Sequence, residues 1–273
     1  MKYEILDKGI KIDGKEDFSP QHILECGQVF CFEKTGEGYV VFPADKRALI
    51  IEEEQGYFIK TTTPKYFCDW FDLDRDYSLI KKKLANFPIL TTPIEFGNGI
   101  RILRQDKFEA LISFIISANN NIKRIKLILN RLRELLNGVF PSYSKLLEKD
   151  MGYFKEIGAG YRAEYLYKVL RQITPELLEE WQKLPTRQLR EKLISLSGVG
   201  PKVADCVLLF GYNRPDVFPV DTWIHQMYNS FYTPLDNREK IRNNLVMQFK
   251  ELSGFAQQYL FYYQRSSDKI QQS

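Results

Sequence analysis

The stretch that decides the fold reads Leu196-Ser-Gly-Val-Gly-Pro-Lys-Val-Ala-Asp-Cys-Val-Leu-Leu-Phe210. Gly198 and Gly200 flank one apolar residue, a pattern that favours a tight hairpin with exposed backbone amides. Pro201 suits the first position of a helix, which we expect to continue to Phe210. Amides at the start of such a helix can bind a phosphate oxygen. The segment therefore predicts a hairpin and a helix, with Gly198 and Gly200 at a phosphate-binding turn.

Lys202 falls in the first turn of the expected helix, near the positive end of its dipole. The dipole disfavours an ammonium ion there, which would free the amine for nucleophilic attack. Cys206 lies one turn further on the same face. A first-turn lysine can equally be a solvated or phosphate-binding residue, and Cys206 can be a small buried hydrophobic residue. The chemistry of this helix is therefore open when it is considered alone.

A second segment, Pro219-Val-Asp221, stands before another helical run, which we expect over Thr222–Phe231. An aspartate in front of a helix is a common N-cap, because its side chain can accept from the first free amides. A carboxylate close to a nucleophilic lysine can also assist catalysis. Asp221 is thus a candidate for either role.

The chain around these segments divides into two parts. Short β-prone runs over Tyr39–Phe42, Ala48–Glu52 and Tyr57–Thr61 predict antiparallel strands. From about residue 100 the apolar residues recur with a helical period, and Asp106 with Glu109 resembles a capping box. Further helices are expected at these positions: 122–136, 163–172, 175–182 and 186–195. We expect an α+β fold, with a small N-terminal antiparallel β-sheet domain over residues 1–97 and a mainly α-helical helix-hairpin-helix body over residues 98–273.

The composition of the 273 residues limits the class of protein. With 44% hydrophobic and 27% charged residues, the chain fits a folded protein. Its net charge of +4 permits a polyanionic partner without requiring one. The four cysteines have no zinc-site spacing and predict reduced thiols. No segment resembles a signal peptide or a membrane span, so we expect a soluble, cytoplasmic protein that does not bind membranes.

Together, the hairpin with Lys202 and the segment ending in Asp221 resemble the helix-hairpin-helix, Gly/Pro-rich loop and Asp superfamily of base-excision DNA glycosylases. Other motifs are similar to the 8-oxoguanine DNA glycosylases of this superfamily: Cys26–Phe30, Gly99–Asp106, Ser113–Ile122, Gly160–Ala163 and Gly254–Phe261. Members with an iron–sulfur cluster carry four cysteines near the C-terminus, and no cysteine follows Cys206 here. The resemblance implies a monomeric enzyme that acts on double-stranded DNA containing 8-oxoguanine and needs no metal or organic cofactor.

The resemblance also implies catalytic and base-pocket roles. Lys202 would be the nucleophile that forms a Schiff base, after which β-elimination cuts the strand, and Asp221 would be its assisting carboxylate. Cys206 and Phe261 would sandwich the flipped base. Gln257 would meet its Watson–Crick edge. The Gly27 carbonyl would accept from the N7–H that 8-oxoguanine has and guanine lacks.

Four further residues would contact the DNA that remains in the helix. By resemblance, Asn119 would fill the gap left by the flipped base, and Tyr161 would wedge beside it. Arg124 and Arg162 would hydrogen-bond the cytosine opposite, which planar guanidinium groups can do at base-edge acceptors. Without the resemblance, Arg124 would be interpreted as part of a solvated helix face, and Phe261 as core.

One pair of positions departs from the family pattern. Animal and fungal members have His two residues after the Asp, paired with an Asp in the last helix. Here Trp223 and Gln264 occupy these positions, so we expect the phosphate contact to be built differently. Two other functions remain as alternatives: a glycosylase for another damaged purine, and a non-catalytic helix-hairpin-helix DNA-binding protein.

Overall fold

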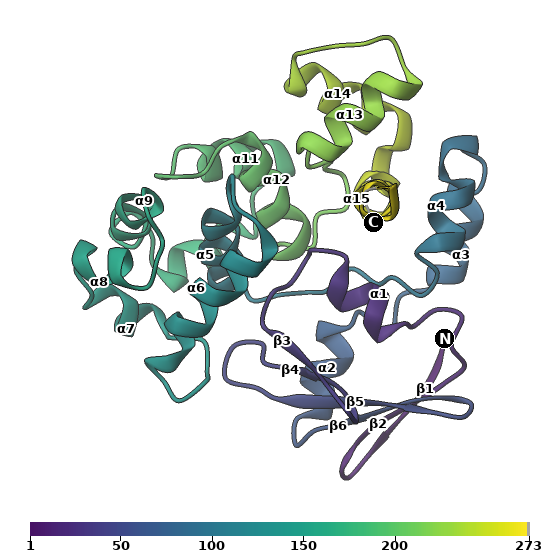
Figure 1. Cartoon of the computed structure of the whole chain (residues 1–273), viewed down its shortest axis with the longest axis horizontal. Helices are drawn as coiled ribbons and strands as arrows, with labels where there is room; N and C mark the ends of the chain where they lie inside the picture. Colours follow the sequence, from purple (N-terminus) through teal and green to yellow (C-terminus); the bar gives the residue numbers. More distant parts are fainter. Residues whose placement is uncertain (272–273) are drawn as a thin grey trace.

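The computed structural model describes residues 1–271, with side-chain environments up to Ser267. Its N-terminal part contains a six-stranded antiparallel sheet in the order β1-β2-β6-β5-β4-β3 (Figure 1). The strands are β1 (Lys2–Leu6), β2 (Gly9–Asp13), β3 (Phe32–Thr35), β4 (Gly38–Val41), β5 (Ala48–Glu53) and β6 (Gly56–Lys60). A helical body follows, and the predicted α+β fold is confirmed.

The helices have the following bounds. Those before the body are α1 (Pro20–Glu25), α2 (Pro64–Trp70), α3 (Tyr77–Leu84), η1 (Pro88–Leu90) and α4 (Thr91–Phe96). The next are α5 (Lys107–Ser117), α6 (Ile122–Glu134), α7 (Tyr143–Leu147), α8 (Met151–Glu156), α9 (Arg162–Val169), α10 (Pro175–Trp181) and α11 (Thr186–Ile194). The last are α12 (Pro201–Phe210), α13 (Thr222–Phe231), α14 (Arg238–Phe249), η2 (Lys250–Leu252) and α15 (Ser253–Gln271). The helices expected around the hairpin and Asp221 are confirmed.

At the start of α5, only one of the two hydrogen bonds expected for a capping box is present. The Asp106 carboxylate accepts from the Glu109 amide at 2.9 Å, as a cap should. Glu109 does not reach back to Asp106, because its carboxylate accepts from the amide of Ala44 at 2.7 Å. Burial there raises the pKa of Glu109 to about 7. The predicted capping box is therefore wrong in its second half, and Glu109 joins α5 to the loop after β4 instead.

The two hydrophobic cores do not follow the expected domain boundary. The sheet has a hydrophobic core that includes Phe18, Trp70 and Phe71. Tyr77 and Leu84 of α3 belong instead to the core of the helical body, although they precede residue 97. The expected division at residues 97 and 98 therefore stays a proposal.

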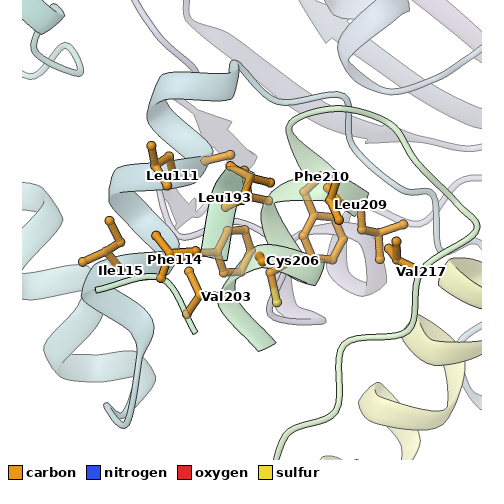
Figure 2. Close-up of a cluster of buried hydrophobic side chains, with 14 of the residues drawn as sticks. Leu111, Phe114, Ile115, Leu193, Val203, Cys206, Leu209, Phe210 and Val217 are labelled. Carbon is orange, nitrogen blue, oxygen red and sulfur yellow. The ribbon is translucent and has the colours of Figure 1, made fainter. Parts of the chain in front are cut away.

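The core of the helical body fixes the helix that carries Lys202. α12 packs along α5, and the rings of Phe114 and Phe210 stack with centroids 5.4 Å apart (Figure 2). Val203 and Cys206 point into the same buried cluster. Their burial fixes the rotation of α12, so the face of Lys202 is determined by packing.

α15 brings the two ends of the chain together. It packs against α13, α14 and α4, and Figure 1 shows it above α1 and the sheet. The Gln258 side chain donates to the Cys26 carbonyl at 2.9 Å, across 232 residues of sequence. Within residues 1–271, no helix has the length and apolar character needed to cross a membrane.

Candidate functional site

A cleft of about 1150 Å³ lies among α5, α6, α12, the start of α13, the turn after α1, and α15. It brings together many of the residues expected from the sequence: Gly27, Asn119, Gly198, Gly200, Lys202, Asp221 and Phe261. Cys206 and Gln257 are buried in its neighbourhood, with 4% and 5% of their surfaces exposed. Tyr161, Arg124 and Arg162 are not among the residues that line it.

The hairpin holds Lys202 at the cleft. Gly198 has φ = +80°, and a Cβ there would lie 2.6 Å from the Cβ of Tyr165, so only glycine fits. Gly200 is the N-cap of α12, and Pro201 is its first residue, as predicted. Lys202 is half-buried, and its Nζ lies 5.6 Å from the centre of the Phe114 ring. The amine therefore lies at the cleft, beside the Phe114 ring.

Cys206 lies one turn beyond Lys202. Burial raises the pKa of its thiol to about 11, while the positive charge of Lys202 opposes this rise. The thiol is consequently neutral at physiological pH. A neutral, buried thiol is a poor nucleophile, so Cys206 acts here as a packing surface beside the amine.

Asp221 is both an N-cap and a neighbour of Lys202. Its Oδ1 accepts from the Ile224 amide at 2.9 Å, which begins α13 as predicted. Burial raises the pKa of Asp221, whereas that amide and the Lys202 charge lower it. The two roles considered for Asp221 are compatible, because the capping contact leaves the carboxylate within the electrostatic reach of the amine.

The opposite wall contains the turn around Gly27. Gly27 has φ = +88°, in the region that favours glycine. Buried Gln28 anchors the turn: its Nε2 donates to the Arg101 carbonyl at 2.8 Å, and its Oε1 accepts from the Leu103 amide at 2.8 Å. With the bond from Gln258 to Cys26, these contacts hold the turn on both sides. The Gly27 backbone is therefore rigidly placed beside α15.

Gln257 and Phe261 follow each other by one turn of α15, as the sequence predicted. The Phe261 ring is half-buried and lines the cleft. The Oε1 of Gln257 is buried and finds no hydrogen-bond donor among the residues described. An unpaired buried polar atom is costly in a free protein, and such atoms often await a ligand.

Sequence reasoning missed Arg265, which lies one further turn along the same face of α15. It lines the cleft with only 7% of its surface exposed. Its guanidinium carbon lies 5.1 Å from the Phe261 ring centre, and its Nη2 donates to the Glu25 carbonyl. Its spacing of four residues from Phe261 was the available signal. Arg238 and Arg242 of α14 also line the cleft and were not predicted.

The residues expected at the opposite base lie together on the loops around Asn119. Asn119 is exposed with φ = +48°, and 54% of Tyr161 is exposed. Arg124 donates to the Gly158 carbonyl at 3.1 Å. Arg162 is buried, and its guanidinium donates to the carbonyls of Ala118 at 2.7 Å and Asn119 at 2.6 Å. In this conformation Arg162 fixes the Asn119 loop, because its donors are used by backbone carbonyls.

The two positions that depart from the family pattern, Trp223 and Gln264, lie in different surroundings. Trp223 lines the cleft next to Asp221, whereas Gln264 is half-buried outside the lining. Asp205, a buried carboxylate that also lines the cleft, is paired with Arg190 and Arg242, each at 2.8 Å. Among residues 1–271, no group of three or more His, Cys, Asp or Glu could hold a metal ion.

Two family models match consecutive parts of the chain. The model for the HhH-GPD superfamily of base excision DNA repair proteins matches residues 112–251, which contain the hairpin and Asp221. This defines the class. The model for the N-terminal domain of 8-oxoguanine DNA glycosylase matches residues 11–111. The chain belongs to the 8-oxoguanine DNA glycosylase family of this superfamily.

Individual relatives agree with this assignment. A crystal structure of Clostridium acetobutylicum 8-oxoguanine glycosylase/lyase, in complex with double-stranded DNA containing cytosine opposite 8-oxoG, superimposes with a TM-score of 0.91. It is 36% identical and covers 98% of this chain and 99% of that one. A probable N-glycosylase/DNA lyase of Methanothermobacter thermautotrophicus is 29% identical over 74% of each chain. The N-glycosylase/DNA lyase OGG1 of Arabidopsis thaliana is 33% identical over 60% of this chain and 51% of that protein.

Proposed function

We propose that this chain is a bifunctional DNA glycosylase and abasic-site lyase that removes 8-oxoguanine opposite cytosine from double-stranded DNA. One observation carries the proposal: the Lys202 amine at the start of α12 shares one cleft with the half-buried Asp221, with Gly27 and with Phe261. A nucleophile and residues that can hold a base within one cleft are what excision of a flipped base requires. A DNA-binding module without catalysis needs neither.

The pocket supports an oxidised purine as the substrate. The base would lie between Cys206 and Phe261, with its Watson–Crick edge at Gln257. The Gly27 carbonyl would then accept from N7–H, a donor that guanine lacks. A site built around one hydrogen-bond donor rejects the analogue without it, because its own buried polar group is left unpaired.

The reaction follows from the placement of Lys202 and Asp221. The Lys202 amine attacks C1′, the bond from C1′ to N9 breaks, and its electron pair leaves with the base. The Asp221 carboxylate stabilises the positive charge that develops on the sugar. The sugar ring then opens to a Schiff base with Lys202. This iminium makes the C2′ proton acidic, so its loss expels the 3′ phosphate and cuts the strand.

The loops around Asn119 would hold the rest of the duplex. Asn119 would fill the vacated space with Tyr161 beside it, and Arg124 would donate to the cytosine. Arg162 would join Arg124 only by exchanging its present carbonyl partners for the base. Lys123 and Arg238 at the cleft would neutralise phosphates. The four free, buried cysteines fit a cytoplasmic enzyme.

Borohydride trapping on duplex DNA with 8-oxoguanine opposite cytosine tests the proposal. The wild type should form a covalent complex, and Lys202→Gln should form none, because only the Schiff base is reducible. Lys168→Gln is the control, since it removes an exposed lysine that pairs with Glu164 outside the cleft and should still trap. Absence of trapping by the wild type would exclude the Schiff base, and absence of base release as well would leave a binding module. Faster release of an alkylated purine would assign a different substrate.

A further inference from the structure

Arg265 is a buried cation whose hydrogen-bonding capacity is only partly used. Its Nη2 donates to the Glu25 carbonyl. Its Nε and Nη1 are buried and find no acceptor in the part of the chain that the structure describes. Burying unpaired donors of a charged group is costly, and a protein retains them where an acceptor arrives later.

The order of side chains on α15 indicates which part of a bound base Arg265 would meet. Gln257, Phe261 and Arg265 follow at intervals of one turn, so Phe261 lies between the other two. A base stacked on Phe261 with its Watson–Crick edge at Gln257 directs its imidazole edge and glycosidic bond toward Arg265. This placement rests on the proposed function.

Two observations agree with this orientation. A Cβ on Gly27 would lie 2.7 Å from Arg265 Nη1, so this donor borders the backbone expected to receive N7–H. Arg265 also lines the same cleft as Asp221, the residue that serves the sugar. Arg265 therefore borders the residue expected to meet N7 and shares the cleft with the residue expected to meet the sugar. On 8-oxoguanine, O8 is the acceptor between N7 and the glycosidic bond at N9.

We propose that Arg265 donates a hydrogen bond to O8 of the flipped 8-oxoguanine and stabilises the base as it departs. Breaking the bond from C1′ to N9 leaves the electron pair on N9, and conjugation through C8 shares this charge with O8. A guanidinium at O8 lowers the energy of that anion. Because Nη1 and Nε are covered in the free protein, the contact forms as the half-buried Phe261 ring shifts to admit the base.

The proposal also extends the basis of specificity. Guanine carries only hydrogen at C8, so it would leave the Arg265 donors unpaired in addition to opposing the Gly27 carbonyl. The substrate class would be purines with an oxygen at C8.

Single-turnover assays on two DNA substrates separate this role from others. Arg265→Met should slow excision of 8-oxoguanine by about 100-fold, the scale for loss of one donor to a developing anion. The same variant should trap a preformed abasic site within about threefold of wild type, because that site holds the same phosphates but no base. The excision rate of Arg265→Lys should lie between those of Arg265→Met and the wild type, since lysine keeps the charge without the planar donors.

Arg214→Met is the matched control. Arg214 is half-buried, donates to the carbonyls of Gln182 and Leu184, and also has a buried Nε without a partner, but it does not line the cleft. It should excise 8-oxoguanine as the wild type does. Equal excision by Arg265→Met and wild type would overturn the proposal. A parallel loss of excision and abasic-site trapping would also overturn it, and would assign Arg265 to the phosphates or to folding. Failure of the wild type to trap would refute the proposed function instead.

Discussion

The two walls of the cleft are built in different ways. The hairpin wall, defined as Gly198–Cys206 with Asp221, comes from 24 consecutive residues. Gly200 occupies the N-cap position of α12, and the Asp221 carboxylate caps α13. The α15 wall, defined as Gly27, Gln257, Phe261 and Arg265, joins chain ends more than 200 residues apart. It contains buried polar atoms without partners. The carboxylate of the hairpin wall has a partner within the protein, whereas the α15 wall contains buried polar atoms that have none among the described residues.

The largest effect is expected at the hairpin wall, where Asp221 combines structure and chemistry. Asp221→Asn keeps an oxygen that accepts from the Ile224 amide, since Asn caps as well as Asp, but it removes the charge. Excision should fall by about 10³-fold or more, the scale for loss of electrostatic stabilisation. Asp221→Ala should be equally inactive and also less stable by about 1 kcal/mol in urea unfolding. A fully active Asp221→Asn would reduce Asp221 to a helix cap.

The same residue gives a pH dependence with a defined sign. Burial raises the pKa of Asp221, so its ionised, active form is lost as pH falls through a value above the ordinary aspartate range. Excision by the wild type should therefore decline on the acid side. For stability the sign is opposite, because the neutral form is favoured by burial and this contribution disappears as pH rises. Asp221→Asn should remove the contribution of this carboxyl group to the pH dependence of stability, as measured by unfolding across pH.

The contrast between the walls also explains what the sequence could predict. The hairpin, α12 and Asp221 follow from local rules, because glycine conformation, a first-turn proline and an N-cap act over a few residues. Gln257 and Phe261 were reached only by resemblance, and Arg265 was missed because its partners, Gly27 and Glu25, belong to the other end of the chain. Long-range contacts have no local pattern. The same reason explains Glu109, whose expected contact was replaced by one to Ala44.

The fold shows the same division. β5 and β6 are runs of β-prone residues on either side of a polar turn, so they were predicted. β1 was not, because it is an edge strand with almost no buried face. α2 was missed because a seven-residue helix has no extended period to recognise, although Thr63 and Pro64 mark its start. Arg162 shows the limit at the site: its residue type fits base recognition, but only the structure reveals that the Asn119 loop occupies its donors.

A smaller effect, confined to base excision, is expected from Gly27→Ala on the α15 wall. A Cβ at this residue would lie 2.7 Å from Arg265 Nη1 and 3.0 Å from the Phe261 ring, in a backbone conformation that favours glycine. Excision of 8-oxoguanine should fall by about 10²-fold, and stability by about 1 kcal/mol. Trapping at a preformed abasic site should persist, because Lys202 lies on the other wall. Gly36→Ala, which meets nothing within 4 Å, is the control. Equal loss on both substrates would show that the walls are not separable.

The smallest effect on excision is expected from substitutions of two adjacent glutamines of α15. They test whether buried atoms without partners distinguish the α15 wall from the hairpin wall. Gln257 has a buried Oε1 without a donor, whereas Gln258, 2% exposed, donates to the Cys26 carbonyl. Gln258→Leu should lower the free energy of unfolding by about 1–3 kcal/mol, because it leaves that carbonyl unpaired. Gln257→Leu should leave stability unchanged or slightly higher, since it removes a polar atom that the free protein does not satisfy. It should nevertheless slow excision by about tenfold, because the Watson–Crick edge loses its partner. Urea unfolding measures the stability of the two variants, and single-turnover assays measure their rates of excision. Equal destabilisation by both substitutions would mean that Gln257 is satisfied in the free protein and that the α15 wall is as complete as the hairpin wall.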